Sequence, residues 1–301
     1  MRAIEIAYAK GHGAHNDFVV LVDPDGRHDL TDLDVTGTCD RRTGIGADGV
    51  LRAVRCESDR EAVSMATAAE WFMDYRNADG SRGSMCGNGI RVFARHLVDA
   101  GLCRPGALAI ATRAGVRRLH VPPAGDITVE MGRPGFSTPA AGGDGVKVTT
   151  EPGSWPATPV DMGNPHAVVF TDDLARDVDL CSPPAVTPSA AFPHGVTVEF
   201  VTVCGPRHLA VRVHERGVGE TMACGTGACA AVAAFQRTMG AGEPGLYVVD
   251  MPGGRLHVTV DNDGTMRLSG PAVIVARGWW SPRGAPSCPG APVPPTGLGI
   301  P

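Results

Sequence analysis

Two cysteines each stand directly before a Gly-x-Gly turn that opens into an apolar, helix-forming run. Cys86 is followed by Gly-Asn-Gly, and Cys224 is followed by Gly-Thr-Gly. A helix N-terminus carries unpaired backbone N–H groups and the positive end of the helix dipole, so we expect a lowered thiol pKa at both cysteines. Two such helix starts facing one another would hold one carboxylate on backbone N–H groups and place a sulfur on each face of the adjacent carbon.

This arrangement suits inversion at the α-carbon of an amino acid. One cysteine, as thiolate, would remove the α-proton, and the other, as thiol, would return a proton from the opposite face. The helix ends would stabilise the charge that develops on the carboxylate, so we expect neither a metal nor an organic cofactor. Two other interpretations are buried structural cysteines and nucleophilic catalysis with His166 as base. The nucleophilic scheme uses one cysteine and leaves the second unit unexplained.

Composition narrows the class of partner. The chain has 301 residues, a formal charge of −5, and only eight Phe, four Trp and three Tyr, with no run rich in Lys and Arg. These features argue against a nucleic-acid partner. The N-terminus lacks the apolar core of a signal peptide and no apolar run reaches membrane-spanning length, which predicts a cytoplasmic protein without a membrane partner. Nine scattered cysteines without a CxxC pair predict reduced thiols.

The surroundings of the two cysteine units predict an internal duplication. Asn77 stands nine residues before Cys86, and Glu215 stands nine residues before Cys224, each where a predicted strand gives way to a loop. Helices are predicted over residues 29–40, 89–100 and 227–238. Strands are predicted over residues 3–9, 18–22, 68–76, 107–112, 116–122, 126–131, 196–203, 209–215, 256–260, 266–268 and 273–276. A Gly/Pro/Ala-rich segment at 132–145 predicts a boundary between lobes at 1–133 and 134–270, and residues 279–301 are predicted to form a Pro/Gly-rich tail.

The order and spacing of these motifs resemble the diaminopimelate epimerase family, which are amino-acid epimerases that work without pyridoxal phosphate. The resemblance covers about residues 3 to 278. The matching motifs are His12-Gly13, Asn16 to Phe18, Thr43 to Gly49, Asn77 to Ser81, Met85 to Arg91, Met162 to His166, Glu215 to Thr221 and Ala223 to Ala228.

The resemblance implies an α/β (α+β) fold of two pseudo-symmetric lobes. Each lobe would be a curved, mostly antiparallel sheet wrapped around a central helix, with the active site in the cleft between them. The last strand, residues 271–278, would return to the first lobe. The implied reaction is the cofactor-independent epimerisation of LL-diaminopimelate to meso-diaminopimelate, for which an amino-acid substrate and a homodimer are the expected partners.

The resemblance also implies roles for individual residues. Cys86 and Cys224 match the acid/base cysteines, and His166 and Glu215 match residues that polarise them. Backbone N–H groups would hold the reacting carboxylate at Gly87, Asn88, Gly225 and Thr226. The substrate's amino groups and distal carboxylate would be contacted by Asn16, Asn77, Asn164 and Arg216. Arginine suits a distal carboxylate because its guanidinium binds one bidentately.

One substrate-binding position departs from the family pattern. Thr197 stands where the family normally has Asn in the pocket for the distal carboxylate. Thr is shorter and offers one hydroxyl instead of an amide. This departure leaves open a racemase or epimerase of a different amino acid, serving a specialised pathway. A catalytically silent relative that binds an amino acid is a third alternative.

Overall fold

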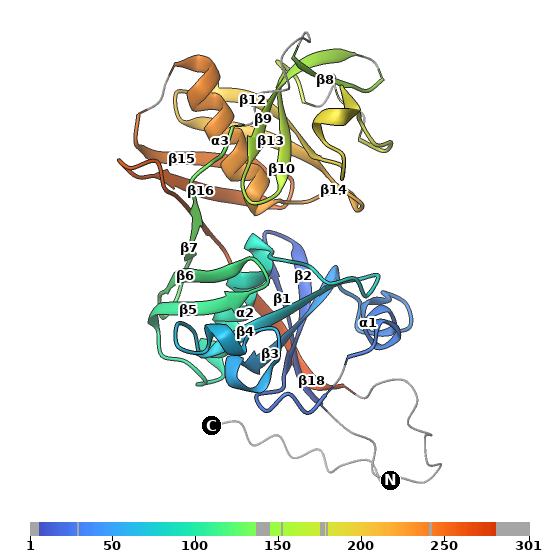
Figure 1. The fold of residues 1–301 in the computed structure, drawn as a ribbon, viewed down its shortest axis with the longest axis vertical. Coiled ribbons are helices and arrows are strands. Elements are labelled where there is room, and N and C mark those ends of the chain that lie inside the picture. Colours follow the sequence, from blue (N-terminus) through green and yellow to red (C-terminus); the bar gives the residue numbers. More distant parts are fainter. Residues whose placement is uncertain are drawn as a thin grey trace.

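The computed structural model describes residues 6–28, 30–136, 145–151, 153–174, 178, 180–240 and 243–280. These residues form a mixed α+β fold with many strands and few helices, as the sequence predicts. Figure 1 shows two lobes, one built on β1 to β6, α1 and α2, and the other on β8 to β16 and α3. Residues 281–301 of the predicted tail lie outside the described part of the chain.

Three helices and eighteen strands make up the described fold. The helices are α1 (Asp32–Cys39), α2 (Gly87–Asp99) and α3 (Gly225–Met239). In the first half the strands are β1 (Ile6–Gly13), β2 (Asn16–Val22), β3 (Gly49–Arg55), β4 (Trp71–Asn77), β5 (Gly106–Thr112), β6 (Gly115–Val121), β7 (Ile127–Gly132), β8 (Val146–Thr149) and β9 (Ser154–Asp161). The remaining strands are β10 (Pro165–Phe170), β11 (Ala185–Thr187), β12 (Thr197–Gly205), β13 (His208–Glu215), β14 (Gly219–Thr221), β15 (Gly245–Met251), β16 (Gly254–Val260), β17 (Met266–Gly270) and β18 (Val273–Trp280).

The helices α2 and α3 begin in the same way, at a cysteine. The sulfur of Cys86 accepts a hydrogen bond from the N–H of Gly89, and the sulfur of Cys224 accepts one from the N–H of Gly227, each at 3.3 Å. Both cysteines are therefore N-cap residues, whose side chains satisfy a backbone donor of the first turn. Because the glycines belong to that first turn, each helix starts two residues earlier than predicted.

The core is continuous around these two helices. Phe93 of α2 is completely buried, Phe235 of α3 is nearly so, and both belong to one apolar cluster that includes residues of both lobes. Burying each aromatic side chain stabilises the fold by about 2–3 kcal/mol. The core thus fixes both helices inside their sheets, which is the arrangement that brings their first turns to a defined place.

Two strand pairings tie the last strands of the chain to its first half, and Figure 1 shows β18 beside β1 in the first lobe. Strand β18 runs antiparallel to β1, so that Ile6 lies opposite Trp280. Strand β7 pairs antiparallel with β17 where the chain passes between the lobes. The side chain of Trp280 is buried whereas Trp279 is 70% exposed, so the last strand extends two residues into the segment predicted as tail. In the described part of the chain, no helix is long and apolar enough to cross a membrane.

Candidate active site

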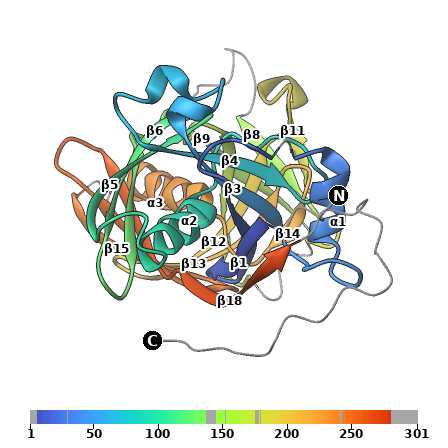
Figure 2. The same ribbon diagram turned by 90° about the horizontal axis from the view of Figure 1, so that it is seen from below.

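The first turns of α2 and α3 meet where the two lobes join. A Cβ atom on Gly87 would lie 3.4 Å from the Cα of Gly225, and a Cβ on Gly225 would lie 3.3 Å from the Cα of Gly87. Figure 2 shows α2 and α3 as neighbours when the molecule is seen from below. The two cysteine units therefore lie side by side, and the sequence predicts that they share one site. Cys86 and Cys224 are both reduced.

The side-chain contact of Cys86 is with an amide. Its thiol donates to Oδ1 of Asn16 at 3.6 Å, and the Nδ2 of Asn16 donates to Oδ2 of Asp48 at 2.8 Å. The Asp48 carboxylate can only accept, so it fixes the Asn16 amide with its oxygen toward the thiol. Asp48 was not among the predicted site residues. Its position within the Thr43 to Gly49 motif could have indicated that Asp48 belongs to the site.

Cys224 is bordered by acids. The carboxyls of Glu215 and Glu199 lie close enough to act on its thiol by charge, and its sulfur lies 3.4 Å from Oγ1 of Thr226. Glu215 in turn accepts a hydrogen bond from Oγ1 of Thr221 at 2.6 Å. The structure thus brings the predicted partner Glu215 to Cys224, and Thr221 holds that carboxyl in place.

Burial raises the pKa of both thiols, contrary to the lowered values expected at helix starts. Burial raises the pKa of Cys86 to about 11, against the opposing effect of the Gly89 N–H. Burial, followed by Glu215 and Glu199, raises the pKa of Cys224 well above its usual value. Burial likewise raises the pKa of Glu215. Desolvation outweighs the helix N-terminus at both positions, although the Cys86 side chain is half-buried and that of Cys224 is buried.

His166 contacts an acid that was not predicted. Its Nδ1 lies 2.6 Å from Oε1 of Glu199, and both side chains are completely buried. The hydrogen bond of His166 is therefore to Glu199 rather than to either cysteine. His166 nevertheless lies close enough to Glu215 for its charge to oppose, in small part, the rise in the carboxyl's pKa that burial causes.

The other predicted binding residues make their hydrogen bonds within strand ends and loops. The backbone N–H of Arg216 donates to Oγ1 of Thr197 at 3.4 Å, and Nη1 of Arg216 donates to the carbonyl oxygen of His194 at 3.1 Å. Asn77 accepts from the Tyr75 hydroxyl at 2.6 Å. Asn164 lies in the turn between β9 and β10, where its carbonyl oxygen accepts from the N–H of Met162. No contact joins Asn164 to the helix starts in the described structure.

A separate hollow of about 550 Å³ lies beside the Arg216 loop. Arg216 itself lines it together with residues that include Phe192, Val198 and His214, and neither Cys86 nor Cys224 contributes to it. Val198 and Thr197 point to opposite faces of β12, because side chains alternate along a strand. We therefore assign the chemistry to the helix starts and not to this hollow.

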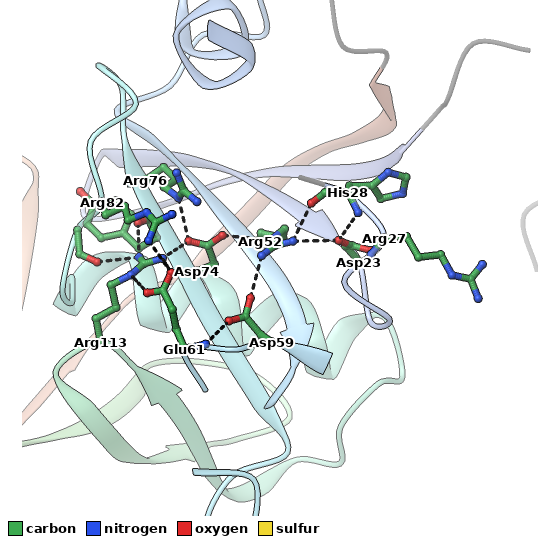
Figure 3. Close-up of polar contacts among 12 residues, drawn as sticks. Asp23, Arg27, His28, Arg52, Asp59, Glu61, Asp74, Arg76, Arg82 and Arg113 are labelled. Atoms are coloured by element: carbon green, nitrogen blue, oxygen red, sulfur yellow. Dashed lines mark hydrogen bonds and ion pairs between the residues drawn. The ribbon is translucent and has the colours of Figure 1, made fainter. Parts of the chain in front are cut away.

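An ion-pair network supports the loop that leads to Cys86, which we call the Cys86 loop (residues 78–85). Figure 3 shows Arg113 directed at Asp74 and Glu61. Nη1 of Arg113 also donates to the carbonyl oxygen of Tyr75 at 2.9 Å and to that of Gly83 at 3.1 Å. Asp74 is buried and further paired with Arg52 and Arg76. Arg113 therefore joins the end of β4 to the Cys86 loop.

This fold occurs in solved structures whose sequences differ widely from the chain. A phenazine biosynthesis protein of the PhzF family from Bacillus anthracis superposes with a TM-score of 0.64 at 17% identity, covering 92% of this chain and 99% of that one. A hydroxyproline epimerase from Agrobacterium vitis, with bound trans-4-hydroxy-L-proline, gives a TM-score of 0.64 at 14% identity and covers 92% of each chain. The fold therefore places the chain in the class of two-lobed proteins to which these structures belong.

Sequence comparison gives the family within that class. The family model described as diaminopimelate epimerase matches residues 8–137 and 158–275. A diaminopimelate epimerase of Streptomyces coelicolor is 53% identical over 278 residues, covering 91% of this chain and 94% of the relative. A diaminopimelate epimerase of Thermobifida fusca is 46% identical over 275 residues, covering 90% of this chain and 96% of the relative. The chain belongs to the diaminopimelate epimerase family, and it is an isomerase of the epimerase type.

Proposed function

We propose that this protein interconverts LL- and meso-diaminopimelate by proton transfer between two cysteines. The observation that carries the proposal is the meeting of two cysteine-capped helix starts at Gly87 and Gly225. Family membership with relatives named diaminopimelate epimerase supports the substrate. The proposal places the enzyme in the cytoplasm, where it acts on a free amino acid. The proposal also includes a homodimer, which light scattering after size-exclusion chromatography tests.

The reaction begins when the substrate's α-carboxylate binds the backbone N–H groups of the two first turns. Helix N-termini favour an anion there, and their N–H groups stabilise the additional charge as the α-carbon loses its proton. One cysteine, as thiolate, forms an S–H bond with the departing α-proton. The electron pair of the broken C–H bond moves toward the carboxylate. The other thiol then donates its proton to the opposite face of the carbon, and the configuration inverts.

The raised thiol pKa values mean that a base must form the thiolate once the substrate is bound. In this proposal Glu215, whose carboxyl acts on Cys224 by charge, takes that proton, since burial brings its own pKa upward toward that of a thiol. Exclusion of water strengthens each of these interactions. In this proposal His166 serves as the second proton-exchanging group of the site.

Recognition of the distal carboxylate falls to the loop at Arg216. Its guanidinium reaches the carbonyl oxygen of His194 and keeps other donors for a carboxylate. Thr197 contacts the backbone of the same residue through a hydroxyl, where the family has an amide. This substitution supports the alternative that the site inverts an amino acid with a different side chain.

Exchange of the α-proton in D2O tests the proposal. Incubation of the reduced enzyme with LL-diaminopimelate should give meso product carrying deuterium at the inverted carbon, detected by mass spectrometry and NMR. Cys86→Ala and Cys224→Ala should each abolish epimerisation. A panel of other amino acids in the same assay separates the two substrate candidates. Absence of both turnover and exchange with diaminopimelate would exclude the first.

A further inference from the structure

The pair formed by His166 and Glu199 is the most enclosed ionisable contact near the two cysteines. Both side chains have no exposed surface, and Nδ1 of His166 lies 2.6 Å from Oε1 of Glu199. The pair is set by strand register: β10 and β12 run parallel with His166 beside Thr197, which places Glu199 two residues further along on the same face. The pair therefore belongs to the wall of the sheet that faces α3.

Glu199 lies against the first turn of α3. A Cβ atom on Gly227 would lie only 2.7 Å from Oε1 of Glu199 and 3.3 Å from the sulfur of Cys224. Because Gly227 has no side chain, the carboxyl of Glu199 has room beside the first turn of α3. The positive end of the α3 dipole offsets part of the cost of burying an acid there. Glu199 is consequently adjacent to Cys224 although it is not hydrogen-bonded to the thiol.

The pair is costly to keep in a core. Burial of a carboxyl and an imidazole without full hydrogen bonding costs several kcal/mol, and an apolar pair of the same size is usually at least as stable. Nε2 of His166 and Oε2 of Glu199 have no hydrogen-bond partner among the described residues. A contribution to stability therefore does not explain the pair. A role in the proposed proton transfer does explain it, because one ring nitrogen of His166 remains without a partner.

We propose that Glu199 is the positioning residue of His166. Its carboxyl occupies Nδ1 in either protonation state, since a carboxylate accepts the Nδ1 proton and a carboxylic acid donates to a bare Nδ1. Nε2 is then the one ring nitrogen able to exchange a proton with the reacting groups, and the ring orientation is fixed. The inference rests on the proposed function, because it assigns the partner of a group that acts in the same reaction.

Two variants of nearly equal volume test this role. Glu199→Gln keeps a polar group opposite Nδ1, and Glu199→Met removes it. We expect Glu199→Met to lower kcat about 10- to 100-fold with little change in KM, the size of effect seen when the carboxylate partner of a metal-bound histidine is removed. Glu199→Gln should retain most of the activity. Asp250→Asn, which alters a second His–carboxylate pair of 2.7 Å at His208, should leave kcat unchanged.

Full kcat in Glu199→Met, or equal losses in both variants, would overturn the proposal. Proton NMR of ¹⁵N-histidine-labelled enzyme gives a readout that does not need turnover. The wild type should show one strongly deshielded proton in the His166–Glu199 bond, which Glu199→Met removes; a wild-type spectrum without it contradicts the pair, even should Glu199→Met fail to fold. If the wild type shows this proton but does not turn over diaminopimelate, the proposed function fails and the pairing stands.

Discussion

The side-chain amide of Asn88 joins the two cysteine units. Its Nδ2 donates to the carbonyl oxygen of Ala223 at 2.9 Å, and its Oδ1 accepts from Nη2 of Arg91 at 2.8 Å. Asn88 is two residues after Cys86, and Ala223 directly precedes Cys224. Arg91 is completely buried and also donates to the carbonyl oxygens of Gly87 and Pro271. One amide therefore sets the spacing between the two helix starts.

Asn88→Ala should lower both stability and activity. The change leaves the Ala223 carbonyl oxygen and one Arg91 donor without partners, which costs about 1–3 kcal/mol in a buried site. Urea unfolding measures the loss, and the D2O exchange assay measures the effect of altered spacing. Asn262→Ala, at an exposed turn, is the matched control. Equal stability of the two variants would mean that the Asn88 bond does not hold the units together.

Gly225→Ala should impair catalysis more than Gly87→Ala. A Cβ on Gly225 would approach Cδ2 of Leu268 to 2.8 Å, whereas a Cβ on Gly87 meets nothing closer than 3.4 Å. The first contact is too short and must displace either Leu268 or the helix start, while the second is ordinary packing. Measured kcat values of the two variants decide the point. Similar kcat values would show that Leu268 moves aside freely.

Thr197→Asn should tighten binding of diaminopimelate. The longer amide adds a donor and an acceptor beside Arg216, and one added hydrogen bond contributes about 1 kcal/mol, or roughly fivefold in KM. The same variant should discriminate more strongly against amino acids without a distal carboxylate. The substrate panel gives both numbers. An unchanged KM would remove position 197 from the determinants of specificity.

Arg113→Met should reduce activity by loosening the Cys86 loop. The variant removes the donor that joins Tyr75 to Gly83 and takes one of three arginine partners from Asp74. Arg82→Met is the matched control, because Arg82 reaches only Glu61 of this network and its side chain is 60% exposed. Alkylation of Cys86, followed by peptide mass spectrometry, should change in Arg113→Met alone. Identical alkylation in both variants contradicts a role in placing Cys86.

Stability should fall as the pH rises above 9. Burial raises the pKa of Cys86 and Cys39 to about 11 and that of Cys229 to about 12, against 9.0 for an unperturbed thiol. A raised pKa in the folded state contributes stability that is complete below pH 9 and is lost as the pH rises through 11 to 12, because the unfolded thiols ionise first. Urea unfolding at pH 8 to 10.5 should show the decline. Cys229→Ala should show a shallower decline, and an equal slope would exclude Cys229 as a source.

The helix starts were predictable from sequence because their signal is local. A cysteine before Gly-x-Gly and an apolar run specify an N-cap and a helix, and the nine-residue spacing of Asn77 and Glu215 to their cysteines marks equivalent strand ends. The strands β9 and β15 were not predicted. Pro156 and Pro159 interrupt the pattern of β9, although it pairs with β8 and β10. Pro244 immediately precedes β15, which begins at Gly245.

Glu199 could not be identified from the sequence for a different reason. It alternates with Val198 and Phe200 in a strand, and such a pattern predicts that the polar face meets solvent. Both faces of β12 are covered, one by the cluster around α3 and one by a smaller apolar cluster that contains Phe200. Only the pairing of β10 with β12 shows that the acid meets His166. The lowered thiol pKa was wrong because local sequence reports the helix dipole but not the depth of burial.

The antiparallel pairing of β7 with β17 has a mechanical consequence. These two strands lie on the outgoing and returning paths of the chain, and they are hydrogen-bonded to one another from Ile127 opposite Gly270 to Gly132 opposite Met266. One lobe can rotate against the other without breaking this ladder only if both strands bend together. Shear along the strands would break the ladder. The β7–β17 ladder thus couples the two connections between the lobe that carries Cys86 and the lobe that carries Cys224.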